Sequence, residues 1–161
     1  MELSLKEIGN KSLSKNIDKL ESIMVGNFPM VDCPVIHRFT DGMYVRETTM
    51  PTGSLITSKI HKTQHTYFVM KGKAIVWIDG VEHLIEAPFI GITEPNTRRV
   101  LYILEECTWA TSHTNPDNET AEQVEDRIIE KHDNIFLSEK EKKMITKQLK
   151  KNSQCLTLQQ G

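Results

Sequence analysis

The chain contains the run Ala74-Ile-Val-Trp-Ile-Asp79-Gly80-Val-Glu-His-Leu-Ile-Glu86, which is its strongest local signal for a β-sheet. Two segments rich in β-branched and aromatic residues flank Asp79-Gly80, a dipeptide suited to the positive φ angles of a type I′ turn. The pattern predicts a β-hairpin, and the two-residue turn fixes how its strands pair.

The same strand-like character extends on both sides of this hairpin, from Cys33 to about His113. Short runs of β-branched and aromatic residues alternate there with turn-forming residues at Asp41-Gly42, Pro51-Thr-Gly53, Lys71-Gly72, Pro88 and Pro95. Short strands at such spacing are typical of an all-β sandwich or barrel.

Helical patterns lie on either side of this region. Residues 3–25 carry apolar residues at a mostly helical spacing that is interrupted near Gly9-Asn10, and they predict an N-terminal helical arm that ends by Gly26. The first predicted helix after the strands opens at the capping box Thr120-Ala-Glu-Gln123 and runs to about Lys131.

A second capping box, Ser138-Glu-Lys-Glu141, predicts a lysine-rich helix from about Glu139 to Lys151, followed by a tail from Asn152. No aromatic residues interleave with these lysines, so nucleic acid is not expected as a partner.

Composition limits the class of protein. A chain of 161 residues is long enough for one domain with a buried core, and its formal net charge of −2 indicates no general attraction to nucleic acid or to anionic membranes. No apolar run approaches the roughly 20 residues of a membrane helix. Cys33, Cys107 and Cys155 lack paired or metal-binding spacing, so no disulfide framework is expected. The first residues lack the order of a signal peptide, and we expect a cytoplasmic protein.

Two histidines flank a short polar break between strand-like runs, in Lys59-Ile-His61-Lys-Thr-Gln-His65. Strand alternation places Lys59 on the same face as His61, and a later strand carries Arg99 on a face that is otherwise apolar. If the turn brings His65 beside His61, the mouth of the barrel presents Lys59, His61, His65 and Arg99 together.

The segment from Gly53 to Gly72 resembles the first motif of the cupin superfamily. Setting Phe68-Val-Met-Lys-Gly72 on the strand end of that motif puts Gly53 at its opening glycine. His61 then falls on the second histidine of the motif, Lys59 on the first, and His65 on the glutamate.

The second cupin motif would correspond to Glu94-Pro-Asn-Thr-Arg-Arg99, with Arg99 where the family has its third histidine. The resemblance implies a mainly β chain with a single double-stranded β-helix, or jelly-roll, barrel over residues 31–113. Together with the helical patterns on either side, we expect an N-terminal helical arm over 1–30 and a C-terminal extension of two helices and a tail over 114–161. The resemblance also implies a homodimer. More narrowly, the chain is similar to small uncharacterised cupin-like proteins of tailed bacteriophages, which raises a viral origin and a place in the host cytoplasm or the virion.

Three functions remain open from the sequence. In the first, the barrel binds a small anionic ligand that is nucleotide-like, a sugar phosphate or a carboxylate. The guanidinium of Arg99 offers a planar fork to such a ligand, Lys59 a point charge, and His61 and His65 further donors. This interpretation uses all four residues.

In the second, His61 and His65 hold a divalent metal such as Zn, Fe, Mn or Ni in an enzyme. Such a site usually needs three protein ligands, and the third would come from His113, Glu106 or His37. In the third, the barrel is a rigid structural or virion component. The sequence leaves open whether the protein is an enzyme.

Overall fold

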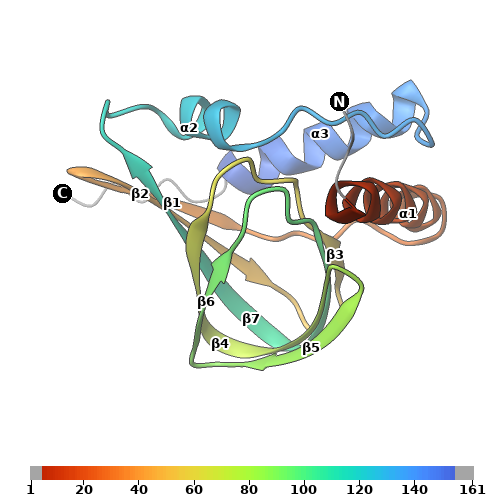
Figure 1. Ribbon diagram of the computed structural model, residues 1–161, viewed down its shortest axis with the longest axis horizontal. Helices are drawn as coiled ribbons and strands as arrows, with labels where there is room; N and C mark the ends of the chain where they lie inside the picture. The colour runs from red at the N-terminus through yellow and green to blue at the C-terminus, as the bar shows by residue number, and fades with distance from the viewer. Residues whose placement is uncertain (1–4, 155–161) are drawn as a thin grey trace.

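The computed structural model describes residues 5–154, and their fold is mainly β (Figure 1). Within these residues, seven strands form an antiparallel sheet that curves into a barrel, with one helix before it and two after it. The predicted fold class is thus confirmed. The elements are α1 (Leu5–Asn27), β1 (Val35–Thr40), β2 (Gly42–Met50), β3 (Leu55–Thr57), β4 (His65–Ile78), β5 (Val81–Glu86), β6 (Phe89–Thr93), β7 (Arg99–Asn115), α2 (Ala121–Ile128) and α3 (Glu139–Gln154).

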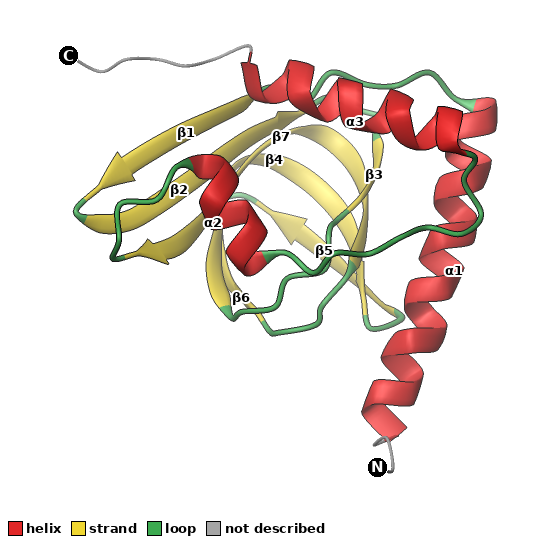
Figure 2. Cartoon of the chain, turned by 90° about the horizontal axis from the view of Figure 1, so that it is seen from above, coloured by secondary structure: helices red, strands yellow, loops and turns green. Residues whose placement is uncertain are grey.

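The long strands β4 and β7 build the barrel because each takes part in two layers (Figure 2). The first half of β4 pairs with β6 and with the second half of β7, where Phe68 lies opposite Ala110. The second half of β4 pairs with β5 and with the first half of β7, where Val76 lies opposite Leu101. The strands β1 and β2 extend the first layer, and β3 extends the second.

Gly72 lies where β4 passes from one layer to the other. The pairing of β4 with β7 shifts register between Val69 and Ala74, and the φ angle of Gly72 is 88°. A Cβ atom here would lie against the carbonyl oxygen of Glu106 and 2.7 Å from that of Glu105. Only glycine fits both this backbone conformation and this close approach of two strands.

The hydrophobic core fills the space between the two layers. Inward residues alternate along β4 and β7 with a period of two, as the strand pattern requires. The cluster consists of Met50, Tyr67, Val69, Ala74, Val76, Ile85, Leu101, Ile103, Cys107 and Trp109. The outer end of the barrel is polar on its inner side, and this is where the candidate site lies.

Local sequence signals predicted several elements correctly. Asp79 and Gly80 adopt φ angles of 51° and 77° between the paired residues Ile78 and Val81, which confirms the predicted hairpin. Both capping boxes form. In each box the cap side chain accepts a hydrogen bond from the amide three residues later, and the side chain of that later residue accepts one from the amide of the cap. The bonds are Gln123 N to Thr120 Oγ1, Thr120 N to Gln123 Oε1, Glu141 N to Ser138 Oγ and Ser138 N to Glu141 Oε2.

Three helix boundaries differ from the predictions. The helix α1 is continuous through Gly9-Asn10 and ends at Asn27. The helix α2 ends at Ile128 rather than near Lys131, because Ile129 has an extended backbone and forms a β-bridge with His61. The helix α3 continues to Gln154, so residues 152–154 belong to it rather than to a tail.

The helix α1 is fixed to the barrel by a buried polar network around Arg98. The guanidinium of Arg98 donates to Asp18 at 2.7 Å and to Glu21 at 2.8 Å, and it also binds Ser14. Both Arg98 and Asp18 have side chains that are only 7% exposed. This network links α1 to the loop that leads into β7.

Several expectations concern other parts of the chain. Cys33 and Cys107 are free thiols, and Cys155 lies outside the described residues. The predictions for residues 1–4 and 155–161 lie outside them too. None of the helices that the structure describes is long and apolar enough to cross a membrane. The division of the chain at residues 30 and 113, and the cytoplasmic location, stay predictions.

Candidate metal centre and anion site

The structure brings together three imidazoles, from His61, His65 and His113, which we call the histidine triad. Their potential ligand atoms all lie within 4.8 Å of one another. The ring centroids of His61 and His65 are 4.4 Å apart, and those of His65 and His113 are 4.6 Å apart. His65 and His113 are buried, and His61 is half-buried.

Strand pairing places two members of the triad. His65 opens β4 and His113 lies near the end of β7, and the pairing of Thr66 with Ser112 brings them side by side. Both project inward, because they continue the alternation of buried residues on their strands.

His61 lies in a loop whose backbone is bound on two sides. It forms the bridge with Ile129, and the amide of Lys62 donates to the carbonyl of Ile128 at 2.7 Å. On the other side, the amide of Asn96 donates to the carbonyl of His61 at 2.8 Å. The end of α2 and the turn before β7 therefore hold this histidine over the other two.

Burial and mutual repulsion keep the triad uncharged. Desolvation, followed by the neighbouring imidazoles, lowers the pKa of His61 and of His113 to about 3. Desolvation also lowers the pKa of His65. Near neutral pH the three rings are neutral, and a neutral imidazole carries the lone pair that a metal ion requires.

Hydrogen bonds to the strand ends orient two of these rings. His65 Nδ1 lies 3.4 Å from the carbonyl oxygen of Thr63, to which it donates when that nitrogen carries the proton. His113 Nε2 lies 3.1 Å from Thr111 Oγ1. A hydrogen bond at one ring nitrogen orients the ring and leaves the other ring nitrogen as the potential ligand.

The donor set fits a divalent transition metal. Imidazole nitrogens bind zinc at about 2.0–2.1 Å, so in a tetrahedral site two of them lie roughly 3.4 Å apart. The triad nitrogens are close enough to reach this spacing by rotation of the side chains. Three neutral nitrogens with positions left open suit Zn, Fe or Ni more than they suit Mg or Ca, which favour oxygen ligands.

Arg99 lies close to the triad on the inner side of the barrel. Its guanidinium carbon is 4.6 Å from the centre of the Tyr67 ring, and its charge contributes to the lowered pKa of His61 and His65. Arg99 is only 7% exposed, and its Nε has no hydrogen-bond partner. The hydroxyl of Thr93, opposite His65 on β6, is also buried without a partner.

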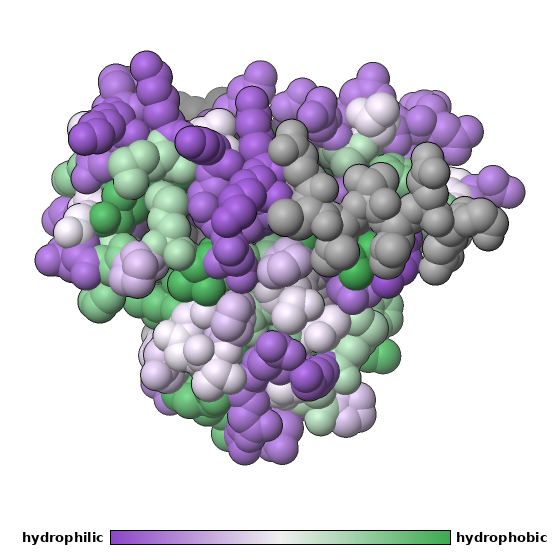
Figure 3. Space-filling model, turned by 180° about the vertical axis from the view of Figure 1, so that it is seen from behind, coloured by the Kyte–Doolittle hydropathy of each residue, from purple (hydrophilic) through white to green (hydrophobic). Residues whose placement is uncertain are grey.

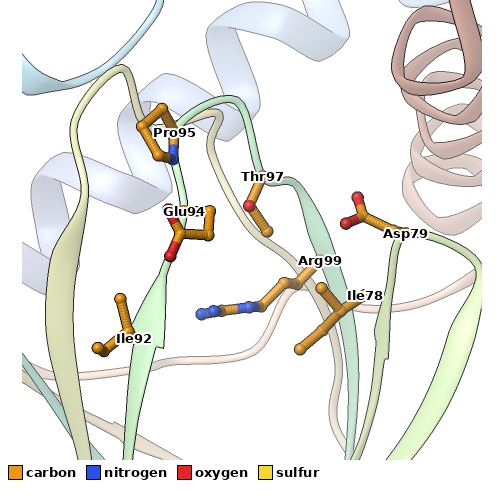
Figure 4. Close-up of a pocket in the computed structure, with 7 residues that line it drawn as sticks. All are labelled: Ile78, Asp79, Ile92, Glu94, Pro95, Thr97 and Arg99. Carbon is orange, nitrogen blue, oxygen red and sulfur yellow. The ribbon is translucent and has the colours of Figure 1, made fainter. Parts of the chain in front are cut away.

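Figure 4 shows Arg99 extending across a cavity of about 110 Å³ toward Ile92. Two carboxylates line this cavity, those of Asp79 and Glu94, and Glu94 accepts hydrogen bonds from Gln64. Within the part of the chain that the structure describes, neither forms an ion pair with Arg99. The full lining is Ile78, Asp79, Ile92, Glu94, Pro95, Thr97 and Arg99.

A second cavity, of about 270 Å³, reaches His65 and His113 from the side of α2. It is lined by polar residues of the β4 and β7 ends together with Met43, Ile92 and Ile128. The polar lining residues are Thr63, Gln64, His65, Thr66, Ser112, His113, Thr114 and Arg127. A solute therefore has access to two of the three imidazoles.

The structure groups some of the residues expected at the barrel mouth and separates others. His61, His65 and Arg99 lie near one another, and His113 is the candidate third ligand that joins the histidines. The ammonium of Lys59 instead pairs with Glu125 of α2, and both side chains are about half exposed.

The other two candidate third ligands lie elsewhere. Glu106 pairs with Lys71 at 2.9 Å on the surface. His37 Nδ1 lies 2.7 Å from the hydroxyl of Tyr44, a buried residue whose pKa is raised to about 12 by desolvation.

Two residues near the triad were missed from the sequence. Tyr44 lies opposite His113 on β2, with ring centroids 6.1 Å apart, and Arg46 follows it on the same face. Neither belongs to a motif, and only the alternation of β2 could have indicated them.

Comparison with known proteins finds similarity in structure only. No family model and no curated protein matches the chain. A cupin protein from Bacteroides fragilis has 13% identity and a TM-score of 0.44, over 59% of this chain and 87% of that one. A protein of unknown function from Vibrio parahaemolyticus has 15% identity and a TM-score of 0.43, over 47% and 81%. Salicylate 1,2-dioxygenase from Pseudoaminobacter salicylatoxidans, with gentisate, has 10% identity and a TM-score of 0.46, over 62% of this chain and 31% of that one.

Proposed function

We propose that this chain is a cupin-like barrel that binds a divalent transition metal through His61, His65 and His113 and a small anionic ligand beside it through Arg99. The observation that carries the proposal is the convergence of three neutral imidazoles from a loop and two strands. It favours the metal-dependent alternative over an anion site built on the histidines themselves.

The charge of the site supports an anionic ligand next to the metal. Three neutral ligands leave the two positive charges of the ion uncompensated, and Arg99 adds a third. Buried charge is costly unless it is paired. A carboxylate or phosphate that reaches both the open metal position and the guanidinium satisfies this requirement, and it also gives Arg99 Nε the partner that it lacks.

A metal held in this way supplies Lewis-acid chemistry at an oxygen of the bound ligand. The residues of the chain then have separate tasks. The triad holds the ion, and Arg99 orients the anionic group. The ring of Tyr67 holds the guanidinium of Arg99 in place through a cation–π contact. The aromatic and aliphatic residues of the core close the inner end of the site.

Cobalt(II) titration tests the metal site, because visible absorption reports how the ion is coordinated. We expect one ion per chain in the wild type. Each of His61→Ala, His65→Ala and His113→Ala should lower the affinity by at least about 100-fold, because loss even of an outer-shell partner costs 10–100-fold.

The control is His83→Ala, since His83 is exposed on β5 and remote from the triad in the sheet. This variant should bind cobalt as the wild type does. Cobalt affinity equal to that of the wild type in all three triad variants would contradict the metal site. So would a loss of affinity in His83→Ala as large as in the triad variants.

Arg99→Gln tests the anion site separately. This variant should keep its metal while its affinity for a small carboxylate falls about 10–100-fold, which is typical of a lost charge-assisted hydrogen bond. Unchanged carboxylate binding would remove Arg99 from the site without affecting the metal.

The remaining expectations are not tested by these observations. The homodimer, the similarity to bacteriophage proteins and the virion role stay predictions. The mass of the protein in solution tests the first of them.

A further inference from the structure

A second arginine, Arg46, lies on the inner face of the barrel, next to the row of the sheet that contains His113. On β2 it shares one face of the strand with Tyr44 and Thr48. It pairs across the sheet with Thr111 of β7. Thr111 in turn binds His113 and lies opposite Tyr67 on β4. Arg46 is therefore one row of the sheet away from His113.

Arg46 has no counter-charge. Among the residues that the structure describes it forms neither an ion pair nor a hydrogen bond through its side chain, although it is half-buried. Arg38, on the neighbouring strand, is paired with Glu47. A guanidinium that is partly removed from water and has no partner is available to an anion.

Arg46 and Arg99 lie near different ends of one row of the sheet. Along one row of the sheet the order is Arg46 on β2, Thr111 on β7 and Tyr67 on β4, and Arg99 lies over the Tyr67 ring. Both arginines contribute to the lowered pKa of His61, and Arg99 contributes to that of His65. Arg46 contributes to the lowered pKa of His113 together with Arg127, an arginine that already pairs with Glu119. Arg46 thus lies on the β2 side of this row, and Arg99 lies on its β4 side.

We propose that Arg46, the histidine triad and Arg99 form one site for a small ligand with two separate anionic groups, of the dicarboxylate class. The inference rests on the proposed function and specifies its ligand. A divalent ion with two arginines carries four positive charges, which one carboxylate compensates poorly and two compensate better. The carboxylates near Arg46 already have partners, because Glu47 pairs with Arg38 and Glu125 pairs with Lys59. Asp79 and Glu94 line the cavity beside Arg99, but within the described residues neither forms an ion pair with it.

Calorimetric titration of the zinc-loaded protein with three probes tests the proposal. The probes are succinate with two carboxylates, butyrate with one, and inorganic phosphate, whose negative charge lies on one compact group. We expect succinate to bind at least about 10-fold more tightly than butyrate, as a second charge-assisted contact implies. Phosphate should bind no more tightly than butyrate.

The variant Arg46→Gln should abolish the preference for succinate and leave butyrate binding within about 3-fold of the wild type. The matched control is Arg38→Gln, which removes an arginine from the adjacent strand that already has an acidic partner. It should keep the preference. Arg99→Gln should weaken both carboxylates.

Equal binding of succinate and butyrate by the wild type would overturn the proposal, even if Arg46→Gln failed to fold. So would a preference that survives in Arg46→Gln, or phosphate bound more tightly than succinate. Zinc content measured in the same samples separates this result from the proposed function. A full complement of zinc without a succinate preference refutes the two-arginine site alone, and absence of zinc binding refutes the metal centre.

Discussion

At the scale of single residues, the site depends on imidazoles that have lost their charge. Each ring of the triad lies among other positive or potentially positive groups, and burial removes the water that would stabilise an imidazolium. Contacts with Thr63 and Thr111 then orient the rings of His65 and His113. Arg99 is buried as well, but its guanidinium keeps its charge, and its Nε has no hydrogen-bond partner.

Gly72 is the residue whose replacement should affect the fold most directly. We expect Gly72→Ala to lower the free energy of unfolding by more than about 2 kcal/mol, because the left-handed backbone alone costs about 1–2 kcal/mol and the new methyl group meets the β7 backbone. Urea denaturation measures the change.

Gly80→Ala is the matched control for this prediction. Gly80 also has a positive φ angle, but nothing lies within 4 Å of the position of its missing Cβ. Gly80→Ala should therefore lower the free energy of unfolding by only about 1–2 kcal/mol. If the two variants were equally stable, the close approach of β4 and β7 at Gly72 would not matter to the fold.

At the scale of elements, α1 is a functional neighbour of the site rather than a detached arm. Arg98 binds α1 while the next residue, Arg99, points into the barrel. His132 and Asn134, from the segment between α2 and α3, bind the same two acidic residues of α1. The helix therefore holds the strand end that carries Arg99.

Removing Arg98 should be costly. We expect Arg98→Met to lower the free energy of unfolding by about 3–5 kcal/mol, because it leaves the buried carboxylate of Asp18 with less compensation. The control is Arg127→Met, because Arg127 and its partner Glu119 form a more exposed ion pair. This variant should lower the free energy of unfolding by about 0–1 kcal/mol. Similar losses in both variants would show that the buried network has no special weight.

Local signals predicted the elements well, and contacts between distant residues explain what they missed. The hairpin turn and both capping boxes depend on neighbours within four residues, and all three formed as predicted. The early end of α2 depends on the bridge between His61 and Ile129, which no local pattern encodes.

The candidate site was predictable only in part for the same reason. The pair His61 and His65 is visible as a motif, but His113 joins it through the pairing of β4 with β7. Arg46 reaches the site through the pairing of β2 with β7 and carries no signal of its own. Lys59 looked like a site residue because its acidic partner, Glu125, is far away in the sequence.

At the scale of the whole molecule, the face in Figure 3 is more hydrophilic over the helices than over the strands. Figure 3 shows hydrophilic side chains concentrated along the helical edge, with more hydrophobic and neutral residues over the strands below. The buried polar groups at the barrel end belong to neither surface. They make the stability of the whole metal-free protein depend on pH.

The metal-free protein should lose stability as the pH falls below about 6.5. In the unfolded chain His61 and His113 take up protons near that pH, whereas in the folded chain their pKa is about 3. The folded state is therefore penalised between about pH 6.5 and pH 3, by up to roughly 1.4 kcal/mol per pH unit for each histidine.

Urea denaturation of metal-free protein at a series of pH values measures this loss. The double variant His61→Gln and His113→Gln should show a smaller slope over the same range, and the difference between the two slopes isolates the histidines from other titrating groups. Parallel slopes would mean that these imidazoles are not held neutral in the folded protein.

The central claim is that three histidines from a loop and two strands hold one metal ion. Crystals of the zinc-loaded protein, measured on both sides of the zinc absorption edge, test it most directly. We predict one strong anomalous peak at about 2.0–2.1 Å from a nitrogen of each of His61, His65 and His113. A peak at other residues, or none at the triad in protein shown to contain zinc, would contradict the claim.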